Sequence, residues 1–324
     1  MTNPQIERKL IEIMRVITEG DKPIGARNIA DELNERGYGI GERAVRYHLR
    51  ILDERGLTKK HGYAGRTVTE LGKKELKEAL IGDRLGFVIT RIEDLIYKTD
   101  YNLESKSGNV IVNLSNIDKN DFDDVVEIMR YASKGGAIIS PRVRIFEEDE
   151  DSDIYVPKGK IAIATVCSIT FDGLLLKSGI PVKPAYGGIL ELKDHEPTRF
   201  TDLISYNGTS IDPIKIFMSR HSTSVLDVLE TGTGKMLANM RQIPASAVEK
   251  ANEVLELAKL SGINGAIKIG NEGEALFGAP VDAGRSGIPV LVGVNAIAAV
   301  EETGIEVNTY PVSTVMEYST MSEI

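Results

Sequence analysis

Residues 42–55 place apolar and cationic side chains at a spacing that divides a helix into two faces. Successive residues of a helix are about 100° apart, so Val45, Leu49 and Leu52 would fall on one side of a helix over this range. The opposite side would carry Arg43, Arg46, Tyr47 and Arg50. Guanidinium groups bind phosphates and base edges, so this face has the chemistry that a helix in the major groove requires.

The segment after this helix adds further positive charge. Residues 57–69 consist of two short strand-like runs around a glycine-rich tip. This pattern predicts a β-hairpin, or wing, on which Lys59, Lys60 and Arg66 are available to DNA phosphates.

Two earlier helices would position this binding surface. Residues 4–19 place apolar side chains at helical spacing, and Gly20 and Pro23 end that run. Residues 25–34 predict a second, shorter helix. Three helices followed by a hairpin predict a winged helix-turn-helix DNA-binding domain over residues 1–80. The alternative is a small helical bundle whose basic face is only solvated.

The charge distribution favours DNA contact through this N-terminal head alone. The net charge of the chain is −9. Residues 1–80 have a balance of +3, whereas the remainder has a balance of −12. An acidic body repels DNA, so we expect the head to make the contact.

Several other classes of protein are disfavoured by the sequence. The single cysteine, Cys167, excludes internal disulfides and a cysteine-cluster zinc site. Residues 231–235 resemble the end of a phosphate-binding loop, but Leu229 and Met236 replace the glycine and the hydroxyl residue that the motif needs. No apolar run reaches the roughly 20 residues of a membrane helix. We therefore expect a cytoplasmic protein that is not an enzyme and that has no metal, no cofactor and no membrane contact.

The rest of the chain predicts an α/β effector domain. A connector over residues 81–107 contains a helix at 83–97, and strand-like and helical segments alternate over 108–324, with a strand beginning at Gly136. Residues 108–117 align with 234–243 at an offset of 126, so we expect two similar lobes, about 108–232 and 233–324. Two alignments are possible later in the halves. One matches Gly179 to Gly304, and the other matches the identical pentapeptides at 178–182 and 286–290.

A cleft between two such lobes is a common place for a small ligand, near strand ends with free backbone groups. The polar or charged candidates at or near these ends are Cys167, Ser168, Thr170, Lys177 and, through the Gly304 match, Asn295. An alternative interpretation is that Ser168 and Thr170 only cap the following helix and that Cys167 is a small buried hydrophobe.

Several segments together resemble the archaeal NrpR family of nitrogen-regulation repressors. They are the head and residues 167–170, 177–182, 186–188 and 206–213, and the likeness covers nearly the whole chain. The resemblance implies a repressor of nitrogen-assimilation genes that binds palindromic operators in double-stranded DNA and is released by 2-oxoglutarate. It also implies that Cys167, Ser168 and Thr170 take part in the effector response, and more weakly Lys177. Some family members join two effector domains, so a second NrpR-type effector protein is a possible partner.

The expected mechanism is that of a homodimer. Its two recognition helices would enter successive major grooves about 34–36 Å apart, and ligand binding between the lobes would change that separation. Three alternatives stay open: a regulator of the same build that senses another metabolite, an enzyme with a DNA-binding appendage, and a passive architectural DNA binder.

Overall fold

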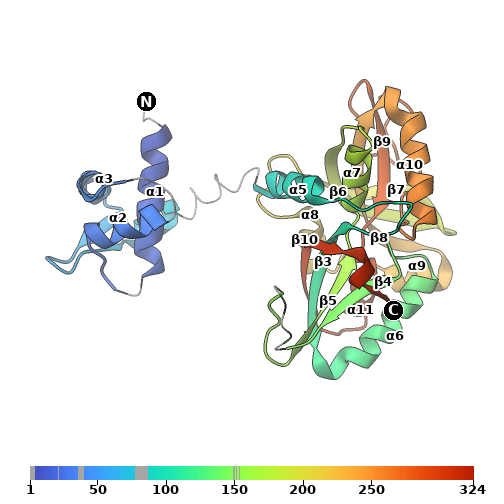
Figure 1. The fold of residues 1–324 in the computed structure, drawn as a ribbon, viewed down its shortest axis with the longest axis horizontal. Helices are drawn as coiled ribbons and strands as arrows, with labels where there is room; N and C mark the ends of the chain where they lie inside the picture. The colour runs from blue at the N-terminus through green and yellow to red at the C-terminus, as the bar shows by residue number, and fades with distance from the viewer. Residues whose placement is uncertain are drawn as a thin grey trace. The chain divides into compact units, whose positions relative to one another are not determined.

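The computed structural model describes residues 4–20, 22–35, 40–76, 87–148, 150, 152 and 154–324. The chain divides into two compact units, Met1–Leu85 and Gly86–Ile324 (Figure 1). Each unit has its own buried apolar core. The expected turn at residues 37–41 and the start of the connector helix at 83 fall largely outside the described residues.

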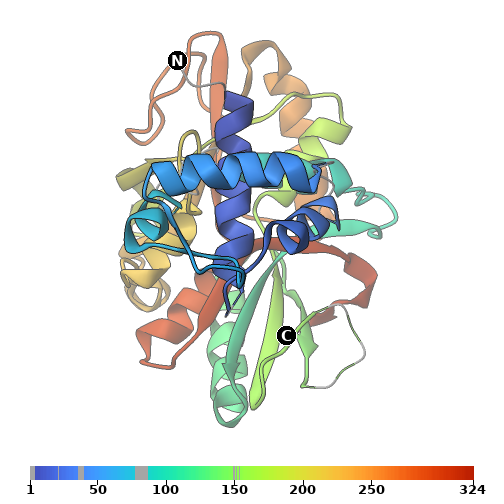
Figure 2. The same cartoon turned by 90° about the vertical axis from the view of Figure 1, so that its left-hand side faces the viewer.

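The first unit has the predicted winged-helix order. Three helices are followed by an antiparallel two-stranded wing and by helical backbone over residues 70–76. Figure 2 shows the helices, in blue, crossing one another. The elements are α1 (Pro4–Glu19), α2 (Ala26–Glu35), α3 (Glu42–Glu54), β1 (Thr58–Lys60) and β2 (Arg66–Val68). Leu10, Ile29 and Leu49, one from each helix, lie fully buried in the common core.

Two close contacts fix the wing and the turn. Ile24 and Arg66 exchange backbone hydrogen bonds of 3.1 and 3.0 Å, which tie the wing to the connection between α1 and α2. Gly65 allows this approach, because a Cβ there would lie 2.3 Å from the Ile24 carbonyl group and its φ is +118°. The Asn34 side chain donates to the Ile40 carbonyl oxygen at 3.0 Å and accepts from its N–H at 2.8 Å, so α3 begins at a defined place.

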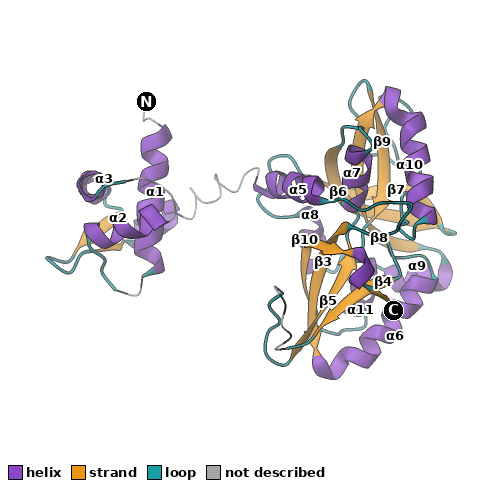
Figure 3. Cartoon of the chain, viewed as in Figure 1, coloured by secondary structure: helices purple, strands orange, loops and turns teal. Residues whose placement is uncertain are grey.

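The second unit alternates helices and strands, as Figure 3 shows by colour. Its first half consists of α5 (Phe87–Lys98), β3 (Asn109–Asp118), α6 (Phe122–Lys134), β4 (Arg142–Phe146), β5 (Lys160–Val166), α7 (Thr170–Lys177), β6 (Lys183–Lys193), β7 (Glu196–Ser205), α8 (Pro213–Ser219) and α9 (Val225–Thr231). The second half consists of β8 (Gly234–Pro244), α10 (Val248–Leu260), β9 (Arg285–Leu291), α11 (Asn295–Glu302), β10 (Asn308–Glu317) and β11 (Ser322–Glu323). Short 3-10 turns precede α6, α10 and β11.

The strand expected at Gly136 is wrong. The residue follows α6 with a φ of +76°, and the Gly136 N–H donates to the Ser133 carbonyl oxygen at 3.1 Å. The glycine therefore terminates the helix in a left-handed conformation, and the next strand begins only at Arg142.

The two halves repeat one another, as the sequence predicted. Phe122 and Val248 begin equivalent helices at an offset of 126, while Thr170 and Asn295 begin equivalent helices at an offset of 125. The second offset is that of the Gly179 and Gly304 match. The competing pentapeptide match is wrong, because residues 286–290 lie within β9 whereas 178–182 follow α7.

The predicted lobe boundary near residue 232 does not separate the two sheets, because the halves exchange their final strands. One sheet has the order β10-β3-β5-β4-β11 and the other the order β7-β6-β8-β9. Thus β6 of the first half pairs with β8, and β10 of the second half pairs with β3. The helices follow the same exchange, since α6 packs on α11 and α7 packs on α10.

All strand pairs in the second unit are antiparallel among the described residues. The expectation of a ligand at strand ends assumed the crevice outside the carboxyl ends of parallel strands. In antiparallel sheets those ends alternate between the two edges. The general reason to place a ligand there is therefore absent in this fold.

A buried ion pair joins α7 to β8. Asp172 and Arg241 have side chains that are 0% and 1% exposed, and the Arg241 Nε lies 3.1 Å from the Asp172 Oδ2. The guanidinium N–H groups are not aligned on the carboxylate oxygens, so the contact is one of charges rather than of well-formed hydrogen bonds. Burial raises the pKa of Asp172 to about 6, although Arg241 opposes that rise.

Asp172→Ala should destabilise the second unit, because it leaves a buried cation without its counter-charge. The expected loss in the free energy of unfolding is about 3–5 kcal/mol, measured by urea denaturation. The double variant Asp172→Leu/Arg241→Met should recover most of that loss. As a control, Asp282→Ala removes the half-exposed pair with Lys183 and should cost no more than about 1 kcal/mol. Equal losses for Asp172→Ala and Asp282→Ala would contradict this assignment.

Candidate DNA-binding head and effector region

Helix α3 separates into the two faces that the sequence predicted. Val45, Leu49 and Leu52 are completely buried. The side chains expected to contact DNA are exposed: Arg43, Arg46, Tyr47 and Arg50. Tyr47 is 52% exposed, and the centre of its ring lies 5.8 Å from the Arg50 guanidinium carbon. The face thus combines cations with an aromatic ring that can pack on sugar or base.

Ion pairs on α3 leave these arginines available. The Arg46 Nε donates to Glu42 at 3.0 Å, and the Arg50 Nε lies 3.6 Å from a Glu54 oxygen. Both arginine side chains are about 70% exposed. Exposed pairs at this helical spacing contribute only about 0.3–0.5 kcal/mol, so a DNA phosphate can displace either carboxylate.

The wing differs from the expectation at one of its three predicted residues. Lys59 and Lys60 are exposed on β1. The Arg66 side chain is only 17% exposed, and its Nε and Nη2 bind Asp53 at 2.9 and 2.8 Å. Thr58 donates to the same carboxylate at 2.6 Å. The guanidinium of Arg66 therefore anchors the wing to α3, while Lys59 and Lys60 stay exposed on the wing.

The residues predicted to bind ligand are mostly buried in the second unit. Cys167, Ser168, Thr170 and Asn295 are at most 2% exposed. None of them lines a described pocket. Burial raises the pKa of the Cys167 thiol to about 12, which argues against a role as a nucleophile. Ligand binding by these four residues stays a prediction that would require the structure to open.

Thr170 and Asn295 make the same structural contact in the two halves. The Thr170 hydroxyl accepts from the Ile111 N–H at 3.1 Å and donates to the Ile111 carbonyl oxygen at 3.2 Å. The Asn295 side chain accepts from the Leu237 N–H at 2.8 Å and donates to its carbonyl oxygen at 3.0 Å. Ile111 and Leu237 are equivalent in β3 and β8. Each polar side chain therefore fastens the start of a helix to the strand of the same half.

Ser168 belongs to a buried polar chain that sequence reasoning did not find. The Asn239 amide donates to the Ser168 hydroxyl at 2.8 Å, and the Tyr206 hydroxyl donates to the Asn239 carbonyl oxygen at 3.1 Å. All three side chains are at most 2% exposed. A signal was present in the repeat, because Asn113 and Asn239 occupy the same position of the strands that align at the offset of 126.

Helix α5 packs directly over this region. Its apolar stripe, Ile92, Leu95 and Ile96, forms one buried cluster with Ile111, Cys167, Ile169, Tyr206 and Val312. Lys177 lies at the end of α7, exposed, with its Nζ 5.4 Å from the centre of the Tyr97 ring of α5. The 167–170 segment and Lys177 are therefore both neighbours of α5, the described element that follows the head in the sequence.

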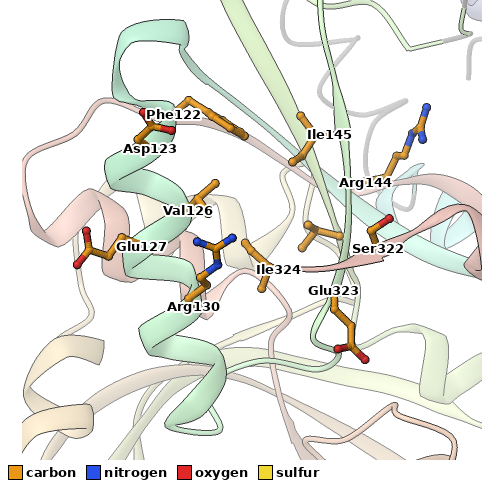
Figure 4. A pocket seen from close by; sticks show the side chains of 11 residues that line it. Phe122, Asp123, Val126, Glu127, Arg130, Arg144, Ile145, Ser322, Glu323 and Ile324 are labelled. Carbon is orange, nitrogen blue, oxygen red and sulfur yellow. The ribbon is translucent and has the colours of Figure 1, made fainter.

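Two pockets of the second unit are candidates for a small ligand. The larger, about 540 Å³, lies between α6, β4 and the C-terminal residues (Figure 4). Its labelled side chains include the carboxylates Asp123, Glu127 and Glu323 and the guanidinium of Arg130. The other, about 280 Å³, lies between α5, α8 and β10, and two of its lining residues are Arg91 and Lys215. The described residues contain no cluster of metal-ligating side chains and no helix long and apolar enough to span a membrane.

Comparisons with known proteins agree with both units. Residues 85–323 match the family described as NrpR regulatory domains NRD1 and 2, and residues 11–76 match the ribonuclease R winged-helix domain. The chain is 64% identical to the global nitrogen regulator NrpRI of Methanosarcina mazei, and the match covers the full length of both proteins.

More distant relatives extend beyond the matched region. The global nitrogen regulator NrpR of Methanocaldococcus jannaschii is 34% identical over 98% of this chain, which spans 55% of that protein. A crystal structure of a nitrogen repressor-like protein from Methanococcus jannaschii superposes with a TM-score of 0.62 at 30% identity, covering 73% of this chain and 97% of that one. The chain therefore belongs to the NrpR family.

Proposed function

We propose that this protein represses nitrogen-assimilation genes by binding their operators through the head, and that 2-oxoglutarate in the second unit releases it. The observation that carries the proposal is the exposed arginine and tyrosine face of α3 in a chain whose relatives are named nitrogen regulators. The repressor role is supported by the structural likeness to a nitrogen repressor-like protein. The acidic body, with its balance of −12, favours DNA contact by the head alone.

A homodimer fits this proposal best. One head offers a single recognition helix, and a palindromic operator presents two equivalent half-sites about 34–36 Å apart. Two copies of the chain would place one α3 in each half-site. A second NrpR-type effector protein as a partner stays a prediction; it is supported by the longer relatives, of which this chain spans about half.

A gel shift on promoter DNA of nitrogen-assimilation genes tests the proposal. The purified full-length chain should retard the promoter fragment, and 2-oxoglutarate should weaken the complex by about 5–150-fold, the usual range of allosteric coupling. Glutamine and a nucleotide, tested in parallel, should have no effect. Release by one of those compounds instead would favour a regulator that senses another metabolite.

Arg43→Ala should weaken binding to the specific operator by about 5–150-fold, because an arginine on the recognition helix contributes about 1–3 kcal/mol. Fluorescence anisotropy with labelled operator measures the change. Lys60→Ala on the wing should weaken operator and random DNA alike and lower the salt dependence by about one ion.

Arg15→Ala is the matched control for these variants. Arg15 is a half-exposed arginine of α1 that is paired with Glu19 at 3.1 Å. Its loss should leave operator affinity nearly unchanged. If Arg15→Ala and Arg43→Ala weaken the complex equally, α3 is not the recognition helix.

Ser168→Ala should blunt the response to 2-oxoglutarate while the head still binds operator. The substitution removes the acceptor of the Asn239 amide beneath α5, so the Asn239 and Tyr206 side chains lose their fixed arrangement. The concentration of 2-oxoglutarate that releases half of the DNA should rise. Ser178→Ala provides the control, since the Ser178 hydroxyl donates to the Leu174 carbonyl oxygen at 2.9 Å, at the C-terminal end of α7. An unchanged response in Ser168→Ala would show that the hydrogen bonds among Ser168, Asn239 and Tyr206 take no part in the response to 2-oxoglutarate.

A further inference from the structure

We propose that the effector, a short dicarboxylate such as 2-oxoglutarate, binds in the pocket between α5, α8 and β10. This inference rests on the proposed function and assigns it a site that the sequence did not predict. The residues that carry the argument are Arg91, Ser210, Asp212, Lys215 and Tyr310, together with the backbone around Val312.

Two cations from different helices line this pocket. Arg91 on α5 donates from its Nη2 to the Ser313 carbonyl oxygen at 2.8 Å, and the other donors of its guanidinium group make no further hydrogen bond among the described residues. Lys215 on α8 has its Nζ 4.9 Å from the centre of the Tyr310 ring. A dicarboxylate needs two such partners, since each charged hydrogen bond to a carboxylate is roughly twice as strong as a neutral one.

A carboxylate of the protein already lies beside these two cations. Asp212 caps α8 by accepting from the Ile214 N–H at 2.8 Å. Burial raises the pKa of Asp212 to about 6; hydrogen bonds from the Ile214 and Lys215 N–H groups oppose that rise, and the charges of Arg91 and Lys215 oppose it to a smaller extent. Both cations are thus close enough to stabilise a negative charge here. A ligand carboxylate would compete with Asp212 for the same partners, and a carboxyl group with a raised pKa gives up its charge more easily than an ordinary one.

The size and remaining lining suit a small metabolite. The volume of about 280 Å³ lies just below the roughly 300–1,000 Å³ of sites for drug-sized ligands. Val88, Ile92 and Ile211 provide apolar walls, and Ser210 adds a hydroxyl group. An apolar wall with a few convergent polar groups is the usual composition of a small-molecule site.

The lining of the pocket includes strained backbone. Val312 has a φ of +49°, which is unfavourable for a β-branched residue, and it is 5% exposed. The pairing of β10 with β3 is interrupted there, between Tyr310 and Thr314. The buried Asn113 side chain accepts from the Val312 N–H at 3.1 Å and helps to hold the conformation. Such strain costs of the order of 1–3 kcal/mol and persists mainly at functional sites.

The pocket shares helix α5 with the buried 167–170 segment. Ile92 lines the pocket and also packs in the cluster that contains Cys167 and Ile169. A ligand that pulls Arg91 away from the Ser313 carbonyl oxygen would shift α5 against that cluster. Residues 167–170 can therefore affect the effector response by changing how α5 packs, without contacting the ligand.

The larger pocket between α6 and β4 is a poorer site for a dianion. Asp123, Glu127 and Glu323 line it, and its Arg144 is already paired with Glu150 at 2.6 Å. The three carboxylates outnumber the one remaining cation, Arg130, so a dicarboxylate would be repelled. Arg130 nevertheless makes a good control, because it is an arginine that lines a pocket of the same unit.

Isothermal titration calorimetry of the full-length protein with 2-oxoglutarate tests the assignment. Arg91→Ala and Lys215→Ala should each raise the dissociation constant by about tenfold or more. Ile211→Trp should block the pocket sterically without changing its charge. Arg130→Ala should bind like the wild-type protein. Thermal unfolding of each variant checks that the second unit is folded. The monocarboxylate 2-oxobutyrate should bind at least about tenfold more weakly than 2-oxoglutarate, since it can engage only one of the two cations.

The outcomes separate this inference from the proposed function. The wild-type protein could bind 2-oxoglutarate while the folded Arg91→Ala, Lys215→Ala and Ile211→Trp variants bind it equally well. That result would show that 2-oxoglutarate is the effector but binds at another site. Equal binding of 2-oxobutyrate would overturn the two-cation arrangement. If the wild-type protein binds no 2-oxoglutarate and its operator complex ignores the compound, the proposed effector is wrong, and the site falls with it.

Discussion

The contact between the two chain crossings constrains the whole of the second unit. After β5 the chain passes to the other lobe at residues 167–169, and after β9 it passes back at 292–294. The crossings touch, since a Cβ at Gly293 would lie 1.8 Å from the Val166 carbonyl oxygen. Thr170 and Asn295 then fasten the two helices that follow to β3 and β8. Each sheet is completed only by a strand of the other half, so neither lobe can move far without disturbing both crossings.

This arrangement explains why polar residues at the first crossing are buried. Ser168, Asn239 and Tyr206 satisfy one another inside the protein, and a buried polar chain of this kind specifies one arrangement because breaking any link leaves unpaired groups. Helix α5 packs against the first crossing through Ile92, which lies in the same buried cluster as Cys167. The crossing therefore supports the element through which the chain arrives from the head.

Local patterns in the sequence predicted the head and the order of elements well. The faces of α3 follow from helical periodicity, which depends only on neighbouring residues. The role of Arg66 was missed because its partner, Asp53, lies on another element and pairs only after folding. The strand exchange was missed for a similar reason, since a repeat in the sequence shows which segments are alike but not which strands pair.

The effector pocket lay beyond sequence reasoning because its members come from three distant segments. Arg91, Lys215 and Tyr310 belong to no common motif, and each alone resembles an ordinary surface residue. The pairing of β10 is irregular between Tyr310 and Thr314, the segment that lines the pocket together with residues of α5 and α8. Proline precedes Val312 in the sequence, yet nothing in the local pattern predicts a valine with positive φ.

The energies involved suit a switch rather than a rigid scaffold. Allosteric coupling of about 1–3 kcal/mol is comparable to the strain of one unfavourable backbone conformation, so a small change at β10 and α5 is sufficient. Coupling is also reciprocal: a ligand that weakens operator binding by some factor must itself be bound more weakly, by the same factor, when the operator is present. Helix α5 packs partly on this strained strand, so a ligand bound between α5, α8 and β10 can bias its position.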